Sequence, residues 1–154
     1  MFPVFKPSGR LDNFLFDITH HFLERKVDEH GHSCIEITIV VKGTADHWLN
    51  GNYQRVYPGC VIVVLPGGTH RFENAKNLEV FNLSCQPELF LSNKLSLEFL
   101  QRGNLLFSLS GESSLFTLFG TVFLDVCNLL NQMHEAFCGP GVEKHHLQLR
   151  TWFI

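Results

Sequence analysis

Two histidines and a glutamate share one face of an apolar segment in the first quarter of the chain. His30, His32 and Glu36 are separated by even numbers of residues. Because side chains alternate between the two faces of a β-strand, all three point the same way. Isoleucines and valines surround Glu36 in the sequence, which indicates a buried strand. A buried carboxylate is costly unless it is paired, hydrogen-bonded or bound to a metal.

A third histidine, His70, follows the turn 66–68, which has the sequence Pro-Gly-Gly and ends an apolar strand. A side chain at this position can be directed back across a β-barrel toward the first two histidines. Three imidazoles and one carboxylate are compatible with Zn²⁺, Ni²⁺, Fe²⁺ or Mn²⁺. The candidate metal ligands are therefore His30, His32, Glu36 and His70. The same side chains would also suit a polar ligand-binding surface or a structural hydrogen-bond network, and the sequence leaves these interpretations open.

Short apolar segments separated by turns make up the first two-thirds of the chain. The sequence predicts strands over 13–22, 35–41, 44–49, 53–56, 60–65 and 78–84, with a polar loop over 73–77. The residues 50–52, Asn-Gly-Asn, form a good hairpin turn because Asn and Gly tolerate positive φ. Strands with this spacing would close as a jelly-roll barrel.

Helical spacing replaces the strand pattern in the last third of the chain. We predict a short helix over 94–102, a clear one over 113–137 and a third from about residue 142 to the end. Apolar residues recur every three or four positions in the second helix, at Leu115, Phe119, Val122, Val126, Leu130, Met133 and Phe137. This stripe and its apolar flanks predict self-association through 113–137 as a two-fold dimer. The abrupt end of the third helix suggests a piece of a longer protein.

Composition restricts the class of protein. The 154 residues, 45% hydrophobic and 18% charged, fit a single globular domain. No apolar run approaches the roughly 18–20 residues that span a bilayer, and the N-terminus lacks the features of a signal peptide. The five cysteines are predicted to be free thiols in a reducing cytosol, which predicts a cytoplasmic protein without a membrane partner. The net charge of −3 argues against direct nucleic-acid binding.

The two histidine segments resemble the paired motifs of the cupin superfamily. The first motif, H-x-H-x3-E-x6-G, matches at His30, His32, Glu36 and Gly43. The second, G-x5-P-x-G-x2-H-x3-N, matches at Gly59, Gly67, His70 and Asn74, with the proline one place late at Pro66. The resemblance implies a mainly β fold, in which a cupin (jelly-roll) barrel is followed by C-terminal amphipathic α-helices.

The whole layout is similar to the N-terminal domain of AraC/XylS-family transcription regulators, and within that family to rhamnose-operon activators. Residues 25–90 carry the likeness through the histidine-rich segment, the 50–51 hairpin and the turns at 57–59 and 66–68. The resemblance implies an effector-binding barrel over 1–90 and a helical dimerisation segment over 91–154, packed together as one structural domain. It implies a small-molecule effector, usually a sugar, a homodimer, and DNA contacts only through a domain absent from this chain.

The sugar-binding interpretation assigns effector contacts to His32, Glu36, Trp48 and His70, and assigns no catalytic residue. Trp48 is either a stacking platform for a sugar or an ordinary core aromatic, because the alternation in 44–49 does not settle its face. Residues 2–5 are either an arm over the pocket or a strap packed on the barrel. An alternative function is a metal-dependent cupin enzyme, such as a dioxygenase or sugar isomerase. A cupin fold and a set of metal ligands do not by themselves establish an enzymatic activity. The helical C-terminus also fits a regulator better than a small enzyme.

Overall fold

The computed structural model describes residues 4–5, 16–87 and 114–138. The chain divides into two compact units, Met1–Leu118 and Phe119–Ile154. Residues 114–118 therefore belong with the strands of the first unit. The helices predicted over 94–102 and from residue 142 lie outside the described residues. In the described ranges, no helix combines the length and apolar character that crossing a membrane requires.

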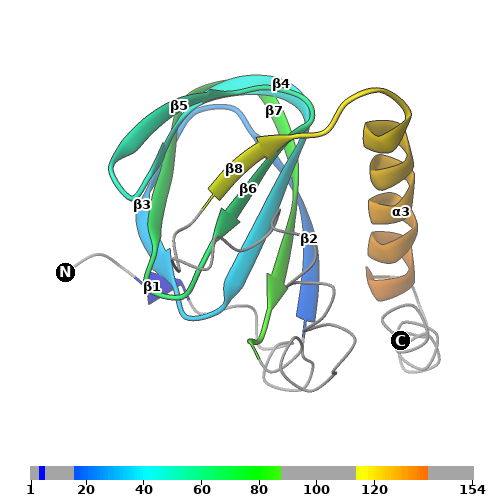
Figure 1. The fold of residues 1–154 in the computed structure, drawn as a ribbon, viewed down its shortest axis with the longest axis horizontal. Helices are drawn as coiled ribbons and strands as arrows, with labels where there is room; N and C mark the ends of the chain where they lie inside the picture. The colour runs from blue at the N-terminus through cyan, green and yellow to red at the C-terminus, as the bar shows by residue number, and fades with distance from the viewer. Residues whose placement is uncertain (1–3, 6–15, 88–113, 139–154) are drawn as a thin grey trace. The chain divides into compact units, whose positions relative to one another are not determined.

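The first unit is built from one largely antiparallel sheet of eight strands among the described residues (Figure 1). They are β1 (Val4–Phe5), β2 (Phe16–Leu23), β3 (Val27–His32), β4 (Ile35–Leu49), β5 (Asn52–Val56), β6 (Cys60–Val64), β7 (Thr69–Cys85) and β8 (Ser114–Thr117). Neighbours follow the order β1-β3-β7-β4-β6-β8, while β2 also pairs with β7 and β5 with β4. The central strands β4 and β7 pair with different partners at their two ends, so the sheet curls into a barrel. The predicted mainly β cupin-type fold is confirmed.

Two long bent strands replace several shorter predicted ones. The predicted polar loop over 73–77 is wrong, because these residues continue β7, which pairs with β4 from Leu49↔His70 to Ile35↔Cys85. Asn74 and Asn77 have positive φ angles of 50° and 47°, Gly43 has a φ of 76°, and the β4–β7 register shifts nearby. Such bulges bend a strand without ending it. The polar residues therefore mark a bend in the barrel wall.

The structure contains the predicted hairpin turn at 50–51, and residues 4–5 form a strand. Asn50 and Gly51 have φ angles of 50° and 79°, as expected for the tight turn that joins β4 to β5. Residues 4–5 form β1, which pairs in parallel with Gly31 and His32 of β3. The N-terminal segment thus lies beside the strand that carries two of the candidate ligands.

The start of the helix predicted over 113–137 is wrong. Residues Ser114–Thr117 form β8, which pairs antiparallel with β6, and the Leu118 N–H donates to the Gly59 carbonyl at 2.9 Å. Leu-Phe-Thr suits a strand, and β6 offers an edge for it. Helix α3 spans Gly120–Cys138, so the structure describes one C-terminal helix where several were predicted.

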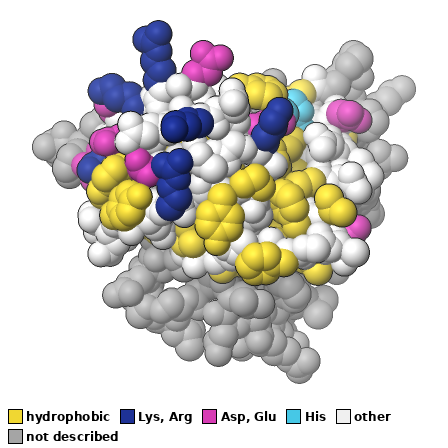
Figure 2. Space-filling model, turned by 90° about the horizontal axis from the view of Figure 1, so that it is seen from above, with side chains coloured by type: hydrophobic (Ala, Val, Ile, Leu, Met, Phe, Trp, Pro, Cys, Tyr) yellow, Lys and Arg dark blue, Asp and Glu magenta, His cyan; other side chains and the backbone are white. Residues whose placement is uncertain are grey.

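Apolar side chains from the four strands β4, β5, β6 and β7 fill the interior face of the barrel. They are Val40, Ala45, Leu49, Val56, Cys60, Ile62, Val64, Phe72, Ala75, Leu78 and Val80. Figure 2 shows one outer face, on which basic side chains lie among acidic and apolar ones instead of forming a single patch. This face therefore has no concentrated positive charge of the kind that grips a nucleic-acid backbone.

Candidate functional site

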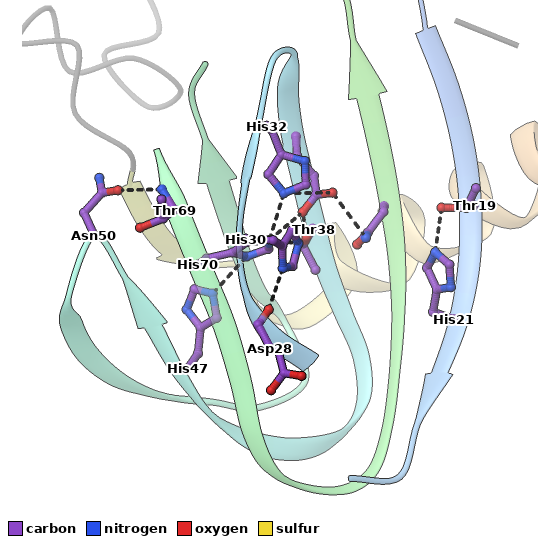
Figure 3. Close-up of polar contacts among 12 residues, drawn as sticks. Thr19, His21, Asp28, His30, His32, Thr38, His47, Asn50, Thr69 and His70 are labelled. Atoms are coloured by element: carbon purple, nitrogen blue, oxygen red, sulfur yellow. Dashed lines mark hydrogen bonds and ion pairs between the residues drawn. The ribbon is translucent and has the colours of Figure 1, made fainter. Parts of the chain in front are cut away.

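Three histidines from two neighbouring strands meet inside the barrel (Figure 3). His70 Nε2 lies 3.0 Å from both His30 Nε2 and His32 Nε2. His30 and His32 lie on β3, and His30 is the direct register partner of His70 on β7. All three side chains are buried, and their ligating atoms lie within 4.8 Å of one another. The structure thus brings together the histidines that the spacing selected.

Glu36 approaches the same cluster from β4, so the prediction that one strand carries both histidines and Glu36 is wrong, because a bend at 33–34 separates β3 from β4. Its Oε1 lies 3.3 Å from His70 Nε2, and its Oε2 lies 3.7 Å from His32 Nε2. The Thr38 hydroxyl donates to Oε1 at 3.1 Å, and the Asn82 amide approaches Oε2 at 3.5 Å. Burial outweighs the bond from Thr38 and raises the pKa of Glu36 to about 7. The carboxyl is therefore held close to polar partners in an otherwise apolar strand.

The separations between these atoms suit a shared divalent metal. Ligand atoms about 2.1 Å from one ion, at angles of about 90–109°, lie about 3.0–3.4 Å from one another. The contacts of His70 Nε2 with His30, His32 and Glu36, at 3.0, 3.0 and 3.3 Å, fall in that range. The Nδ1–H of His30 donates to the Asp28 carbonyl at 2.8 Å, which leaves Nε2 with its lone pair available. The donor set therefore fits a first-row divalent ion.

The imidazoles of His32, His47 and His70 are held in their neutral form. Burial is the main cause that lowers the pKa of His32 to about 4, of His47 to about 3 and of His70 to about 2. Repulsion from His30 lowers all three further. A neutral imidazole has a free lone pair on one of its two nitrogens, so these rings can bind a metal at neutral pH without losing a proton when the tautomer leaves the inward nitrogen unprotonated.

His47 is a site residue that the sequence analysis missed. Its side chain is completely buried, and its Nε2 lies 3.2 Å from His70 Nδ1 (Figure 3). The Gln54 side-chain amide nitrogen lies 2.9 Å from His47 Nδ1. The available signal was its even spacing from Ala45 and Leu49, which are both buried in β4. That parity places His47 on the interior face.

Trp48 is not part of this cluster. It follows His47 in β4, so its side chain lies on the outer face of the sheet. There the Arg71 guanidinium lies over the Trp48 ring, with Cζ 4.3 Å from the ring centroid, and the Tyr53 ring contacts Trp48 edge-on. Both neighbours are register partners of Trp48 on the adjacent strands. The structure therefore separates Trp48 from His32, Glu36 and His70, contrary to the predicted effector site.

A row of polar side chains crosses three adjacent strands on the interior face. Register pairing aligns Glu36 and Thr38 of β4 with Ser84 and Asn82 of β7, and these with Asp17 and Thr19 of β2. The same face carries Val40 and Val80 of the apolar core. Asn82 Oδ1 is buried and has no hydrogen-bond partner among the described residues. The barrel interior thus combines apolar side chains with a polar row in which the Asn82 Oδ1 acceptor has no donor among the described residues.

Comparisons with known proteins give a consistent result. A family model described as "AraC-like ligand binding domain" matches residues 17–149. The HTH-type transcriptional activator RhaS of Mannheimia succiniciproducens is 36% identical over 58 residues, which is 38% of this chain and 22% of RhaS. The match thus spans about a fifth of the length of that relative.

Solved structures are similar to the chain at low identity. Apo ToxT from Vibrio cholerae has a TM-score of 0.57 at 11% identity, covering 78% of this chain and 48% of ToxT. A cupin-2 domain protein from Shewanella frigidimarina has a TM-score of 0.43 at 16% identity, covering 47% of this chain and 72% of that protein. The ToxT similarity bears on the fold alone.

Proposed function

The chain belongs to the family of AraC-like ligand binding domains, and from this premise we propose that its barrel binds a sugar that acts as effector of a transcription regulator. Family and relative together point to a ligand-sensing regulator rather than an enzyme. The enzyme alternative raised by the cupin motifs is thereby set aside. The finer assignment, a sugar in the barrel, depends on the interior side chains.

The unpaired acceptor of Asn82 carries this proposal. A buried acceptor without a donor is unfavourable by about 1–3 kcal/mol, and a ligand hydroxyl would remove that penalty. Sugars combine hydroxyls with apolar C–H faces, and the interior face carries both a row of polar side chains and apolar core side chains. We assign the polar contacts to Asn82 together with His32, Glu36 and His70 of the predicted set. Trp48 is left out because its ring lies on the outer face.

Replacing Asn82 with alanine should weaken sugar binding by about tenfold or more, because a ligand hydroxyl loses its partner in a desolvated site. Calorimetric titration with a panel of neutral monosaccharides would measure the effect. L-rhamnose belongs in the panel because the sequence resembles rhamnose-operon activators. Trp48→Ala is the matched control and should bind as the unaltered chain does. Loss of binding in the Trp48 variant, with normal binding in the Asn82 variant, would move the site to the outer face.

We also propose a divalent metal held by His30, His32 and His70, with Glu36 as the fourth ligand. The donor set is compatible with Zn²⁺, Ni²⁺, Fe²⁺ or Mn²⁺. When bound, such an ion supplies positive charge and open coordination positions to which a sugar hydroxyl can bind. The residues around it exclude water and hold the imidazoles neutral, which supports ligation. The metal and the sugar would then share His32, Glu36 and His70.

Homodimerisation through α3 is the third part of the proposal. The helix buries Leu130, Met133 and Phe137, yet Val122, Leu124 and Leu129 remain 55%, 59% and 41% exposed. Apolar side chains on more than one face of a helix mark an interface, and two-fold symmetry would let α3 meet its copy. DNA would be contacted through a helix-turn-helix domain outside this chain, as the name of the RhaS relative suggests.

Substituting glutamate for both Leu124 and Leu129 should shift the chain toward monomer by at least tenfold in dimer dissociation constant. The cause is the cost of placing charges in an apolar contact. Sedimentation velocity over a concentration series would measure it. Asn128→Glu, an exposed polar position on the same helix, is the control for added charge. A monomer at high concentration in the unaltered chain would refute the dimer.

A further inference from the structure

A series of hydrogen-bonding side chains leads from the histidine cluster through His47, which Figure 3 shows beside His70, to Gln54 on β5. His70 Nδ1 lies 3.2 Å from His47 Nε2, and His47 Nδ1 lies 2.9 Å from the amide nitrogen of Gln54. His47 is completely buried, whereas Gln54 is half-buried on β5. The far nitrogen of His70, Nε2, is the one that faces the centre of the cluster.

Whether Gln54 donates or accepts at His47 determines which nitrogen of His70 carries the proton. A neutral imidazole has one N–H donor and one acceptor nitrogen. When the Gln54 amide nitrogen donates to His47 Nδ1, as in the structure, His47 carries its proton on Nε2 and donates to His70 Nδ1. His70 then carries its own proton on Nε2. Because that proton uses the lone pair a metal needs, His70 in this state is not a ligand.

A half-turn of the Gln54 amide group reverses each bond. The amide oxygen then accepts from His47 Nδ1–H, His47 Nε2 accepts from His70 Nδ1–H, and His70 Nε2 has a free lone pair. The oxygen and nitrogen of an amide are nearly the same size, so the half-turn needs no extra space. His30 has no such freedom, because its Nδ1 faces the Asp28 carbonyl, which can only accept. The cluster thus contains one ring fixed for ligation and one that can be switched.

We propose that Gln54 and His47 form a tautomer relay that controls whether His70 can bind a metal. Metal loading would in turn reverse the Gln54 amide on β5. The inference rests on the proposed metal site and makes Gln54 and His47 positioning residues rather than ligands. Hydrogen-bond partners behind metal-bound histidines fix the tautomer of the ring, and their loss changes metal affinity by about 10–100-fold.

Two substitutions of Gln54 test the relay because they fix opposite directions. Gln54→Glu presents only acceptors to His47 at neutral pH, and Gln54→Lys presents only donors. In the metal-free 154-residue chain, long-range ¹H–¹⁵N spectra of labelled histidines should show His70 protonated on Nδ1 in the glutamate variant and on Nε2 in the lysine variant. Zn²⁺ should bind the glutamate variant at least about tenfold more tightly than the lysine variant.

Asn52 provides the control for charge. It is exposed, lies two residues before Gln54 on β5 and so shares its face of the strand. Asn52→Glu and Asn52→Lys should leave the His70 tautomer unchanged and should differ little in Zn²⁺ affinity. The same His70 tautomer in both Gln54 variants, or equal Zn²⁺ affinities for them, would overturn the relay. If the unaltered chain binds no Zn²⁺, the metal site itself fails, and the tautomers of the metal-free variants then decide separately whether the relay exists.

Discussion

Replacing His32 with alanine should lower the affinity of the chain for Zn²⁺ or Ni²⁺ by more than about 100-fold. His32 Nε2 lies 3.0 Å from His70 Nε2 at the centre of the cluster. Loss of an outer hydrogen-bond partner already costs about 10–100-fold in metal affinity, so loss of a direct ligand should cost more. The unaltered chain should also be stabilised by metal, by about 4 kcal/mol at a free concentration 1,000 times the dissociation constant.

Competition titration with a chromogenic chelator would measure the affinities, and thermal unfolding with and without metal would measure the stabilisation. His21→Ala is the matched control, because His21 is exposed on β2 and donates or accepts one bond with Thr19 (Figure 3). It should bind metal as the unaltered chain does. If His32→Ala retains the metal, the ion lies elsewhere. If the unaltered chain loses metal on dialysis, the cluster is a hydrogen-bonded polar lining.

Substitution of Gly43 by alanine should destabilise the barrel by about 3–5 kcal/mol, a large part of the roughly 5–15 kcal/mol that stabilises a typical domain. Gly43 has a φ of 76°, and a Cβ at this position would overlap the backbone carbonyl of Asn77 on β7. The strain of a left-handed backbone accounts for about 1 kcal/mol of the effect. The remainder comes from separating β4 and β7 at the bend.

Gly51→Ala separates these two causes. Gly51 has nearly the same φ, 79°, but a Cβ there would meet no atom within 4 Å. We therefore expect this variant to lose only about 1 kcal/mol. Urea unfolding followed by circular dichroism would give both free energies of unfolding. Equal losses in the two variants would show that backbone conformation alone, and not the close approach of β4 to β7, requires glycine at position 43.

Local pattern determined the parts of the site that lie within one strand. Even spacing was enough to place His30 and His32 on one face of β3, because the alternation of side chains is a property of every β-strand. Glu36 lies on β4, beyond the bend at 33–34, so its approach to the histidines depends on the pairing of β4 with β7. The turn at 66–68 and the cupin resemblance together pointed to His70, the spacing of the strands predicted the barrel, and the family comparison supports the regulator over the enzyme. The hairpin at 50–51 was also predictable, since its positive φ angles require residues such as Asn and Gly.

Pairing between strands distant in sequence decided the features of the fold and site that the local sequence pattern did not predict. Whether residues 73–77 form a loop or a bent strand depends on β4 lying alongside them, and β8 exists because β6 has an edge to pair with. Strand pairing also places the Trp48 side chain on the outer face of the sheet and the His47 side chain in the histidine cluster. The segment 44–49 alternates polar and apolar residues too weakly to show which side is buried, and only its pairing with β5 and β7 orients it. The sequence by itself thus determined His30, His32, Glu36 and His70 as candidates for a metal or effector site. The tertiary structure added His47 and Asn82 and excluded Trp48, because cross-strand contacts join residues far apart in the chain.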